Sequence, residues 1–208
     1  MHEYLNIHAK CSMNLPNKLT IFRIILVPIM VIIPMLNIQG AWLGIPNTYW
    51  IINLIFIIAS ITDKLDGQIA RKTNQVTNFG KFADPLADKI LVLSAMLLLV
   101  EFGKLPAWIP IVILAREFIV SGYRLIAVEQ GGKVIAASIF GKIKTVTQII
   151  AIIIAFIDVN SFARCLGGGL TGIQLILNIL QTLMMTVCVI ATIISGIDYL
   201  KDGKKILK

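Results

Sequence analysis

The sequence predicts an all-α integral membrane protein with six transmembrane helices and an N-terminal interfacial segment. Of its 208 residues, 57% are hydrophobic and 14% are charged, whereas about a quarter are charged in an average globular domain. The mean hydropathy of +0.87 comes from long apolar runs, and the cations behind the net charge of +8 lie in the short gaps between them. Because a nucleic-acid binder gathers its cations on water-exposed modules, this distribution indicates a lipid bilayer and no nucleic acid as partner.

Six apolar stretches have about the length that a helix needs to cross a bilayer core, which is roughly 20 residues. The first follows residues 14–17, whose sequence Asn-Leu-Pro-Asn looks like a turn into an interfacial helix start. The second, third and fourth stretches carry charges where their ends enter water or face the bundle interior. The predicted spans are residues 19–38, 48–70, 85–102, 107–127, 142–158 and 173–200.

The chain contains neither an internal repeat nor a linker, so we expect a single membrane domain over residues 13–208. Residues 1–12 are polar and lack the basic start and apolar core of a signal peptide. We interpret them as a dispensable extension. Both Met1 and Met13 are then candidate translation starts.

Lysine and arginine are retained on the cytoplasmic side of a membrane, so their positions predict the orientation of the chain. With the N-terminus inside, all but three of the 19 cations fall at or near the cytoplasmic face. Lys104 and Arg164 lie in outer loops, and Arg116 lies within the fourth span. We therefore expect a multi-pass protein of the cytoplasmic membrane, with both termini on the cytoplasmic side.

Four of the 11 acidic residues gather between the second and third predicted spans. Asp63 and Asp66 are three residues apart, and Asp84 and Asp88 are four apart, so each pair shares one helix face. Together the two faces would place four carboxylates around one point, where they would repel one another strongly in a low-dielectric setting. Hard oxygen ligands in this number suit Mg²⁺ or Mn²⁺, which join protein carboxylates to substrate phosphates.

Small residues accompany these aspartates. Gly67 and Ala70 follow Asp63 along the same helix, and Gly80 lies one turn before Asp84. Small side chains leave room for a ligand or for a neighbouring backbone. The alternative is ordinary helix packing with carboxylates solvated at a membrane boundary, but the whole spaced set favours a ligand site.

The segment from Asp63 to Asp88 resembles the signature of the CDP-alcohol phosphatidyltransferase family, D-x2-D-G-x2-A-R-x8-G-x3-D-x3-D, at every fixed position. The resemblance implies a membrane enzyme, usually a dimer of six-helix subunits, that transfers a substituted phosphate from a CDP-linked donor to an alcohol and releases CMP. The implied ligands of a two-metal centre are Asp63, Asp66, Asp84 and Asp88. The resemblance further implies that Asp88 acts as the general base. The implied contacts of the CDP donor are Asp63, Asp66, Gly67, Ala70, Arg71 and Gly80.

Arg116 lies about ten residues into the fourth span, and a charge at that depth marks a candidate site. We favour binding of a substrate phosphate; the alternative is an internal ion pair with Glu117 or with a carboxylate of the aspartate set. Because adjacent residues point about 100° apart on a helix, we expect Glu117 to be a poor direct partner. The cations that would form a pocket for a second, water-soluble phosphate are Arg116, Arg124, Lys142 and Lys144.

Three further strings resemble the phosphatidylglycerophosphate synthase branch of the family. They are N-x-L-T-x-x-R from Asn17, REF-x-V-S-G-x-R from Arg116 and AAS-x-x-GK-x-KT-x-x-Q from Ala136. The resemblance implies transfer of the phosphatidyl group from CDP-diacylglycerol to glycerol 3-phosphate, in the synthesis of anionic phospholipid.

Two other functions stay open. One is another transferase of the family, with inositol phosphate or phosphatidylglycerol as acceptor. The other is a small cation transporter, although transporters usually build their site at the midplane between repeated halves, whereas these acids cluster at one edge.

Overall fold

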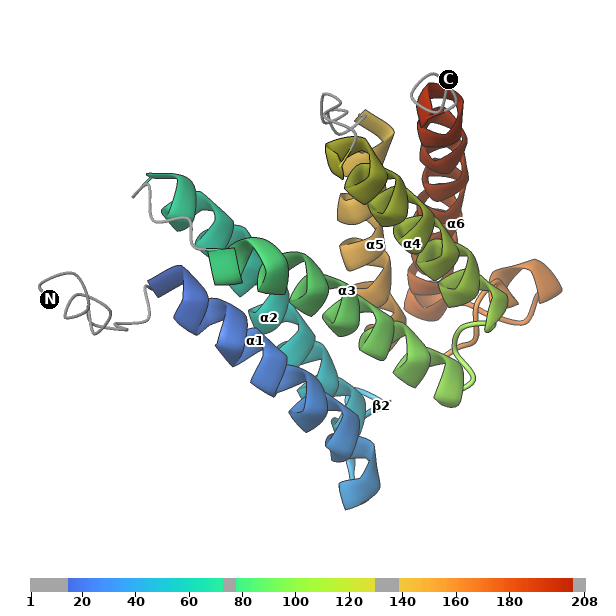
Figure 1. Ribbon diagram of the computed structural model, residues 1–208. Helices are drawn as coiled ribbons and strands as arrows, with labels where there is room; N and C mark the ends of the chain where they lie inside the picture. Colours follow the sequence, from blue (N-terminus) through green and yellow to red (C-terminus); the bar gives the residue numbers. More distant parts are fainter. Residues whose placement is uncertain (1–14, 73–77, 130–138, 204–208) are drawn as a thin grey trace, which may run out of the picture.

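The computed structural model describes residues 15–72, 78–129 and 139–203 and, within these ranges, the side chains of residues 17–63, 83–123 and 141–199. In these ranges six long helices run in alternating directions (Figure 1). They are α1 (Leu15–Ile32), α2 (Asn47–Lys72), α3 (Asn78–Glu101), α4 (Trp108–Glu129), α5 (Ile139–Ile157) and α6 (Gly172–Gly203). The short elements between them are η2 (Ile33–Leu36), β1 (Ala41–Trp42), β2 (Ile45–Pro46) and η3 (Arg164–Gly167).

The helical character of all six predicted segments is confirmed, with bounds that mostly agree to within a few residues. The main differences are at α3 and α1. Helix α3 begins at residue 78 instead of 85, because the helix continues through polar turns that precede the apolar run and contains Pro85. Helix α1 ends at Ile32 instead of residue 38, because η2 follows it. Residues 15–17, expected to form a turn, instead begin α1; proline is tolerated in the first turn of a helix. Residues 1–14 lie outside the described residues, so the extension and the domain start at residue 13 stay predictions.

The helices form two groups, joined through α5 and through a smaller contact between α3 and α4. In the first group α1 packs against α2 and α3, and in the second α6 packs against α4 and α5, while α5 also contacts α2 and α3. Large side chains such as Phe56, Leu99 and Ile152 are fully buried between the helices. Ala59 and Ala155 are also fully buried, and small residues at such positions allow helix backbones to approach closely.

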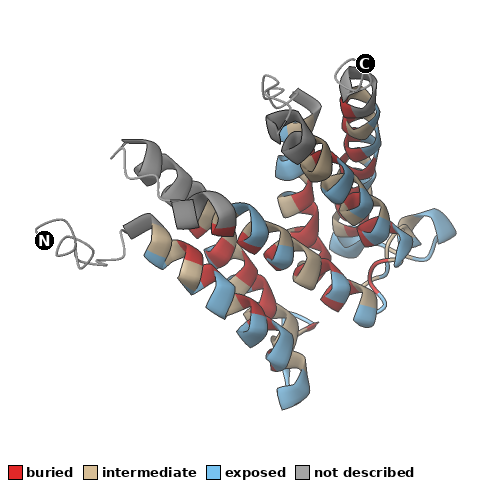
Figure 2. Ribbon diagram, viewed as in Figure 1, coloured by how far each residue is buried: buried red, intermediate tan, exposed pale blue. Residues whose placement is uncertain are grey.

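Exposed positions recur along all six long helices (Figure 2), and many of the described ones carry large apolar side chains. Large hydrophobic side chains are exposed on each of the six long helices, for example Ile25, Leu54, Leu97, Ile111, Val146 and Ile190. Extended exposed apolar surface is uncommon on soluble monomers and marks contact with lipid or with another protein. By length and apolar composition, two described segments qualify as candidate membrane spans, Asn17–Leu36 and Gly172–Tyr199, although core helices of soluble proteins meet the same criteria.

A buried lysine fixes the end of α5. Lys104, in the α3–α4 connection, is 2% exposed, and its ammonium donates hydrogen bonds to the carbonyls of Ala155 (3.1 Å), Phe156 (3.4 Å) and Asp158 (2.5 Å). It also lies 4.0 Å from the ring centroid of Tyr49 on α2. A cation is favourable at the C-terminal end of a helix, where the last carbonyls lack helical partners. Lys104 thus holds α5, whose other end carries Lys142 and Lys144, in a fixed position.

Candidate active site

Helix α1 holds one aspartate of the spaced set from each of the next two helices. Nη1 of Arg23 lies 2.8 Å from Oδ1 of Asp63 on α2, and the Arg23 side chain is fully buried. The hydroxyl of Thr20 donates a hydrogen bond to Oδ1 of Asp84 on α3. Thr20 and Arg23 belong to the N-x-L-T-x-x-R string, so that string organises the carboxylates of the second and third helices.

The described carboxylates at this end of the bundle are electrostatically coupled. Asp63 is repelled by Asp84, and Asp88 is repelled by Asp63, while the Arg23 guanidinium attracts both Asp63 and Asp88. The excess of negative charge and the hard oxygen donors fit Mg²⁺ or Mn²⁺. Among the side chains that the structure describes, no three Asp, Glu, His or Cys groups lie close enough together to hold a metal ion. The three described members, Asp63, Asp84 and Asp88, are therefore not gathered into such a group. The four-aspartate centre stays a prediction, because the side chain of Asp66 lies outside the described residues.

Six of the predicted site residues belong to described helices but lie outside the part of the chain whose side chains are described. They come from α2, α3 and α4 and are Asp66, Gly67, Ala70, Arg71, Gly80 and Arg124. The predicted donor contacts and one of the four predicted acceptor cations therefore stay predictions.

A cavity of about 720 Å³ lies between α3, α4 and α5, with Tyr199 of α6 at its wall. The remainder of its wall is mainly apolar and includes Met96 and Ile113. Its charged lining consists of Asp88, Lys89, Arg116, Glu117, Lys142 and Lys144. The cavity therefore brings together the predicted general base and three of the four cations predicted to bind the acceptor phosphate.

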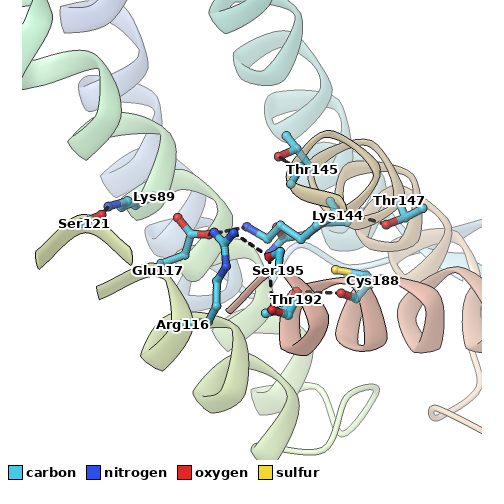
Figure 3. A network of polar contacts seen from close by, with 12 residues as sticks. Lys89, Arg116, Glu117, Ser121, Lys144, Thr145, Thr147, Cys188, Thr192 and Ser195 are labelled. Atoms are coloured by element: carbon cyan, nitrogen blue, oxygen red, sulfur yellow. Dashed lines mark hydrogen bonds and ion pairs between the residues drawn. The ribbon is translucent and has the colours of Figure 1, made fainter. Parts of the chain in front are cut away.

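The expectation that Glu117 would be a poor partner for Arg116 is wrong. Nη1 of Arg116 lies 2.9 Å from Oε1 of Glu117, and Nζ of Lys144 on α5 lies 2.9 Å from the same oxygen (Figure 3). The angle between adjacent residues sets only where the side chains leave the helix. Both side chains are long enough to bend toward one another. The ammonium of Lys144 also attracts the Glu117 carboxylate and stabilises this position.

The sequence profile for CDP-alcohol phosphatidyltransferases matches residues 13–194. A protein of Bacillus subtilis (strain 168) named "CDP-diacylglycerol--glycerol-3-phosphate 3-phosphatidyltransferase" is 42% identical over 200 residues, which cover 94% of this chain and 97% of the relative. The chain belongs to the CDP-alcohol phosphatidyltransferase family.

Two further relatives agree with this membership. A Haemophilus influenzae protein with the same name is 38% identical and covers 92% of this chain and 94% of its own. A Mycobacterium tuberculosis protein (strain H37Rv) named "Probable phosphatidylglycerophosphate synthase" is 36% identical and covers 89% of this chain and 79% of its own. The family and the branch predicted from the motifs are confirmed.

The motifs of this phosphatidyltransferase did not include Lys89, Ser195 or Tyr199, which lie at its charged cavity or contact a residue of it. Ser195 of α6 accepts a hydrogen bond of 2.6 Å from Nη2 of Arg116, and the Tyr199 ring lies 5.6 Å from the guanidinium carbon. Lys89 of α3 donates to the hydroxyl of Ser121 on α4. One available signal was the spacing of Ser195 and Tyr199, which are four residues apart on α6 and so share a helix face.

Proposed function

We propose that the protein transfers the phosphatidyl group of CDP-diacylglycerol to glycerol 3-phosphate, releasing CMP and forming phosphatidylglycerophosphate. The observation that carries this proposal is that Asp88, Arg116, Lys142 and Lys144 line one and the same cavity. Such a lining suits an acceptor that has both an anionic group and a hydroxyl. Relatives that match nearly the whole chain bear the corresponding name, which supports the same acceptor.

In the proposed reaction, the cations of the cavity bind the acceptor phosphate and direct its hydroxyl toward Asp88. Asp88 accepts the hydroxyl proton as the oxygen attacks the phosphorus that bears the diacylglycerol. The new oxygen–phosphorus bond replaces the bond to CMP, which leaves with the electron pair. Holding both reactants in this geometry removes much of the entropic cost of a two-substrate reaction.

Asp63, Asp66, Asp84 and Asp88 are the residues that would hold Mg²⁺ or Mn²⁺. When bound, such cations neutralise a diphosphate and stabilise the leaving phosphate. The ties of Thr20 to Asp84 and of Arg23 to Asp63 support a fixed carboxylate arrangement. Family resemblance supports donor contacts by Gly67, Ala70, Arg71 and Gly80.

The proposed setting is the cytoplasmic membrane, crossed by all six long helices of a homodimeric enzyme, with both termini and the active site on the cytoplasmic side. The large hydrophobic side chains exposed on every long helix support this setting, as does the predicted bias of lysine and arginine toward one face. A site at this boundary would let the lipid donor remain in the bilayer while a soluble acceptor enters from water.

The choice of acceptor can be tested with purified protein in CDP-diacylglycerol micelles. We expect CMP release with glycerol 3-phosphate and little or none with inositol phosphate, phosphatidylglycerol or glycerol. Faster CMP release with one of the other compounds would show that this compound, and not glycerol 3-phosphate, is the acceptor. Donor-independent cation flux in vesicles, without CMP release, would favour a transporter instead.

A further inference from the structure

Glu117 occupies an unusual place in the cavity, because one of its carboxylate oxygens accepts from two cations at once. Oε1 lies 2.9 Å from Nη1 of Arg116 and 2.9 Å from Nζ of Lys144 (Figure 3). The two cations come from different helices, α4 and α5, and both side chains are largely shielded, with exposed fractions of 13% and 9%. The proposed reaction gives Glu117 no role.

The oxygen of Glu117 holds together two charges that would otherwise repel. Since both nitrogens lie 2.9 Å from the same atom, they are less than about 6 Å apart, a distance at which like charges in a partly dry cavity repel appreciably. Without the carboxylate, the Lys144 chain is free to turn away toward water. The guanidinium of Arg116, held by fewer contacts, would also shift.

The other contacts of Arg116 fix its orientation without neutralising it. Ser195 accepts from Nη2 at 2.6 Å, and the Tyr199 ring lies beside the guanidinium. Gly196 of α6 faces the stem of Arg116, since a Cβ built at that glycine would lie 3.2 Å from Cγ. Lys144 keeps further N–H groups for a ligand, because its ammonium has three donors.

The charges around the cavity also match a phosphate monoester. Its described lining carries four cationic side chains, those of Lys89, Arg116, Lys142 and Lys144, and two acidic ones, those of Asp88 and Glu117. The cationic excess is two, and a phosphate monoester carries between about −1.5 and −2 near neutral pH. A neutral polyol would leave that excess uncompensated.

We infer that Glu117 is a positioning residue that holds Arg116 and Lys144 as a preformed pair for the phosphate of the acceptor. The inference rests on the proposed function for the identity of the acceptor. Glu117 acts through the two cations and touches neither the attacking hydroxyl nor the donor. It therefore governs how tightly a phosphorylated acceptor binds, and has little effect on the rate once that acceptor is bound. The competing possibility, that Glu117 blocks the phosphate position, predicts the opposite change in affinity.

The test compares Glu117→Gln, which removes the charge at nearly constant shape, with Glu117→Asp, which withdraws the carboxylate by one methylene. The matched control is Glu101→Gln, at an exposed position at the end of α3. Steady-state CMP release gives kcat and the KM for each substrate. Isothermal titration of glycerol 3-phosphate into donor-free protein measures binding without turnover.

We expect Glu117→Gln to raise the KM and the Kd for glycerol 3-phosphate on the order of tenfold, Glu117→Asp to raise them less, and the control to leave them unchanged. The KM for CDP-diacylglycerol and kcat should stay within about threefold. An unchanged or lowered acceptor KM, or a loss confined to kcat, would overturn the inference.

The inference can still be tested if the Gln variant does not fold or if the proposed function is wrong. If Glu117→Gln does not fold, the Asp variant decides alone, since an unchanged acceptor KM in that variant overturns the inference. If the wild-type protein releases no CMP with glycerol 3-phosphate, the proposed function fails. The titration of glycerol 3-phosphate into the same variants then still decides whether Glu117 positions the two cations.

Discussion

Asp88 is the one described member of the family's aspartate set that lines the cavity together with Arg116 and Lys142. Replacing it by asparagine retains the shape of the side chain but removes the proton acceptor. We expect Asp88→Asn to lower CMP release by about 10²–10⁴-fold, the usual contribution of general base catalysis. The melting temperature should stay close to that of the wild-type protein.

The matched control for this variant is Asp198→Asn, because Asp198 is half-buried on α6 and does not line the cavity. The measurements are CMP release at saturating substrates and thermal unfolding in detergent. Near-normal turnover by Asp88→Asn would exclude Asp88 as the general base.

Arg116 should contribute more than Lys142 to the affinity for the acceptor. Arg116 is shielded and fixed by Ser195, whereas Lys142 is exposed to solvent. We expect Arg116→Ala to raise the KM for glycerol 3-phosphate about 10–100-fold, as for a lost charged hydrogen bond, and Lys142→Ala to raise it only a few-fold because solvent screens its charge. Kinetics with varied acceptor measure both, and equal effects would contradict this ranking.

For single residues, sequence spacing was enough to identify the aspartates but not the side chains that contact them. The i, i+3 and i, i+4 spacings placed Asp63 and Asp84 on shared helix faces with their neighbours. Arg23, by contrast, pairs with Asp63 across 40 positions of sequence, and Ser195 meets Arg116 across 79. Such contacts depend on how whole helices pack, which no local spacing reveals.

The helices themselves were predictable because long apolar runs leave few alternatives. The hairpin between α1 and α2 was not predicted. Its turn residues Leu43 and Gly44 have φ values of 54° and 76°, and two successive positive values are typical of a tight type I′ turn. Leucine rarely adopts such a conformation, so the usual Asn-Gly signal was absent.

The end of α5 provides a prediction about stability. Lys104→Met would keep most of the apolar stem but remove the donor that three backbone carbonyls share. We expect the free energy of unfolding to fall by about 1–3 kcal/mol, because buried carbonyls would be left without partners. Thermal unfolding measures it, with the exposed Lys18→Met as control. An unchanged melting temperature would show that these hydrogen bonds contribute little.

The same lysine should give a characteristic pH dependence. Burial lowers the pKa of Lys104 from 10.5 to about 8, against the opposing effect of the Asp158 carboxylate. The unfolded chain therefore binds this proton more tightly, and the stability that the group contributes is lost as the pH falls from 10.5 to about 8. As the pH is raised from about 8 to 10.5, the melting temperature of the wild-type protein should therefore rise relative to that of Lys104→Met. A difference between the two melting temperatures that stays constant over this range would contradict the lowered pKa.

The whole molecule combines an apolar outer surface with a charged interior at one end. The sequence predicted both features separately, from its apolar runs and from its spaced aspartates. It did not predict that Glu117 on α4 would join Lys144 on α5 and Asp88 on α3 at the same cavity. That arrangement requires three helices to meet, and it is what connects the proposed base to the proposed acceptor site.

The most direct test of this connection is CMP release by the purified protein from vesicles that contain CDP-diacylglycerol. We expect release only when glycerol 3-phosphate and Mg²⁺ or Mn²⁺ are both present, with phosphatidylglycerophosphate formed in equal amount. Removal of the divalent cation by chelation should stop the reaction, and its return should restore it. Release that does not depend on glycerol 3-phosphate, or no release at all with both present, would contradict the proposed transfer.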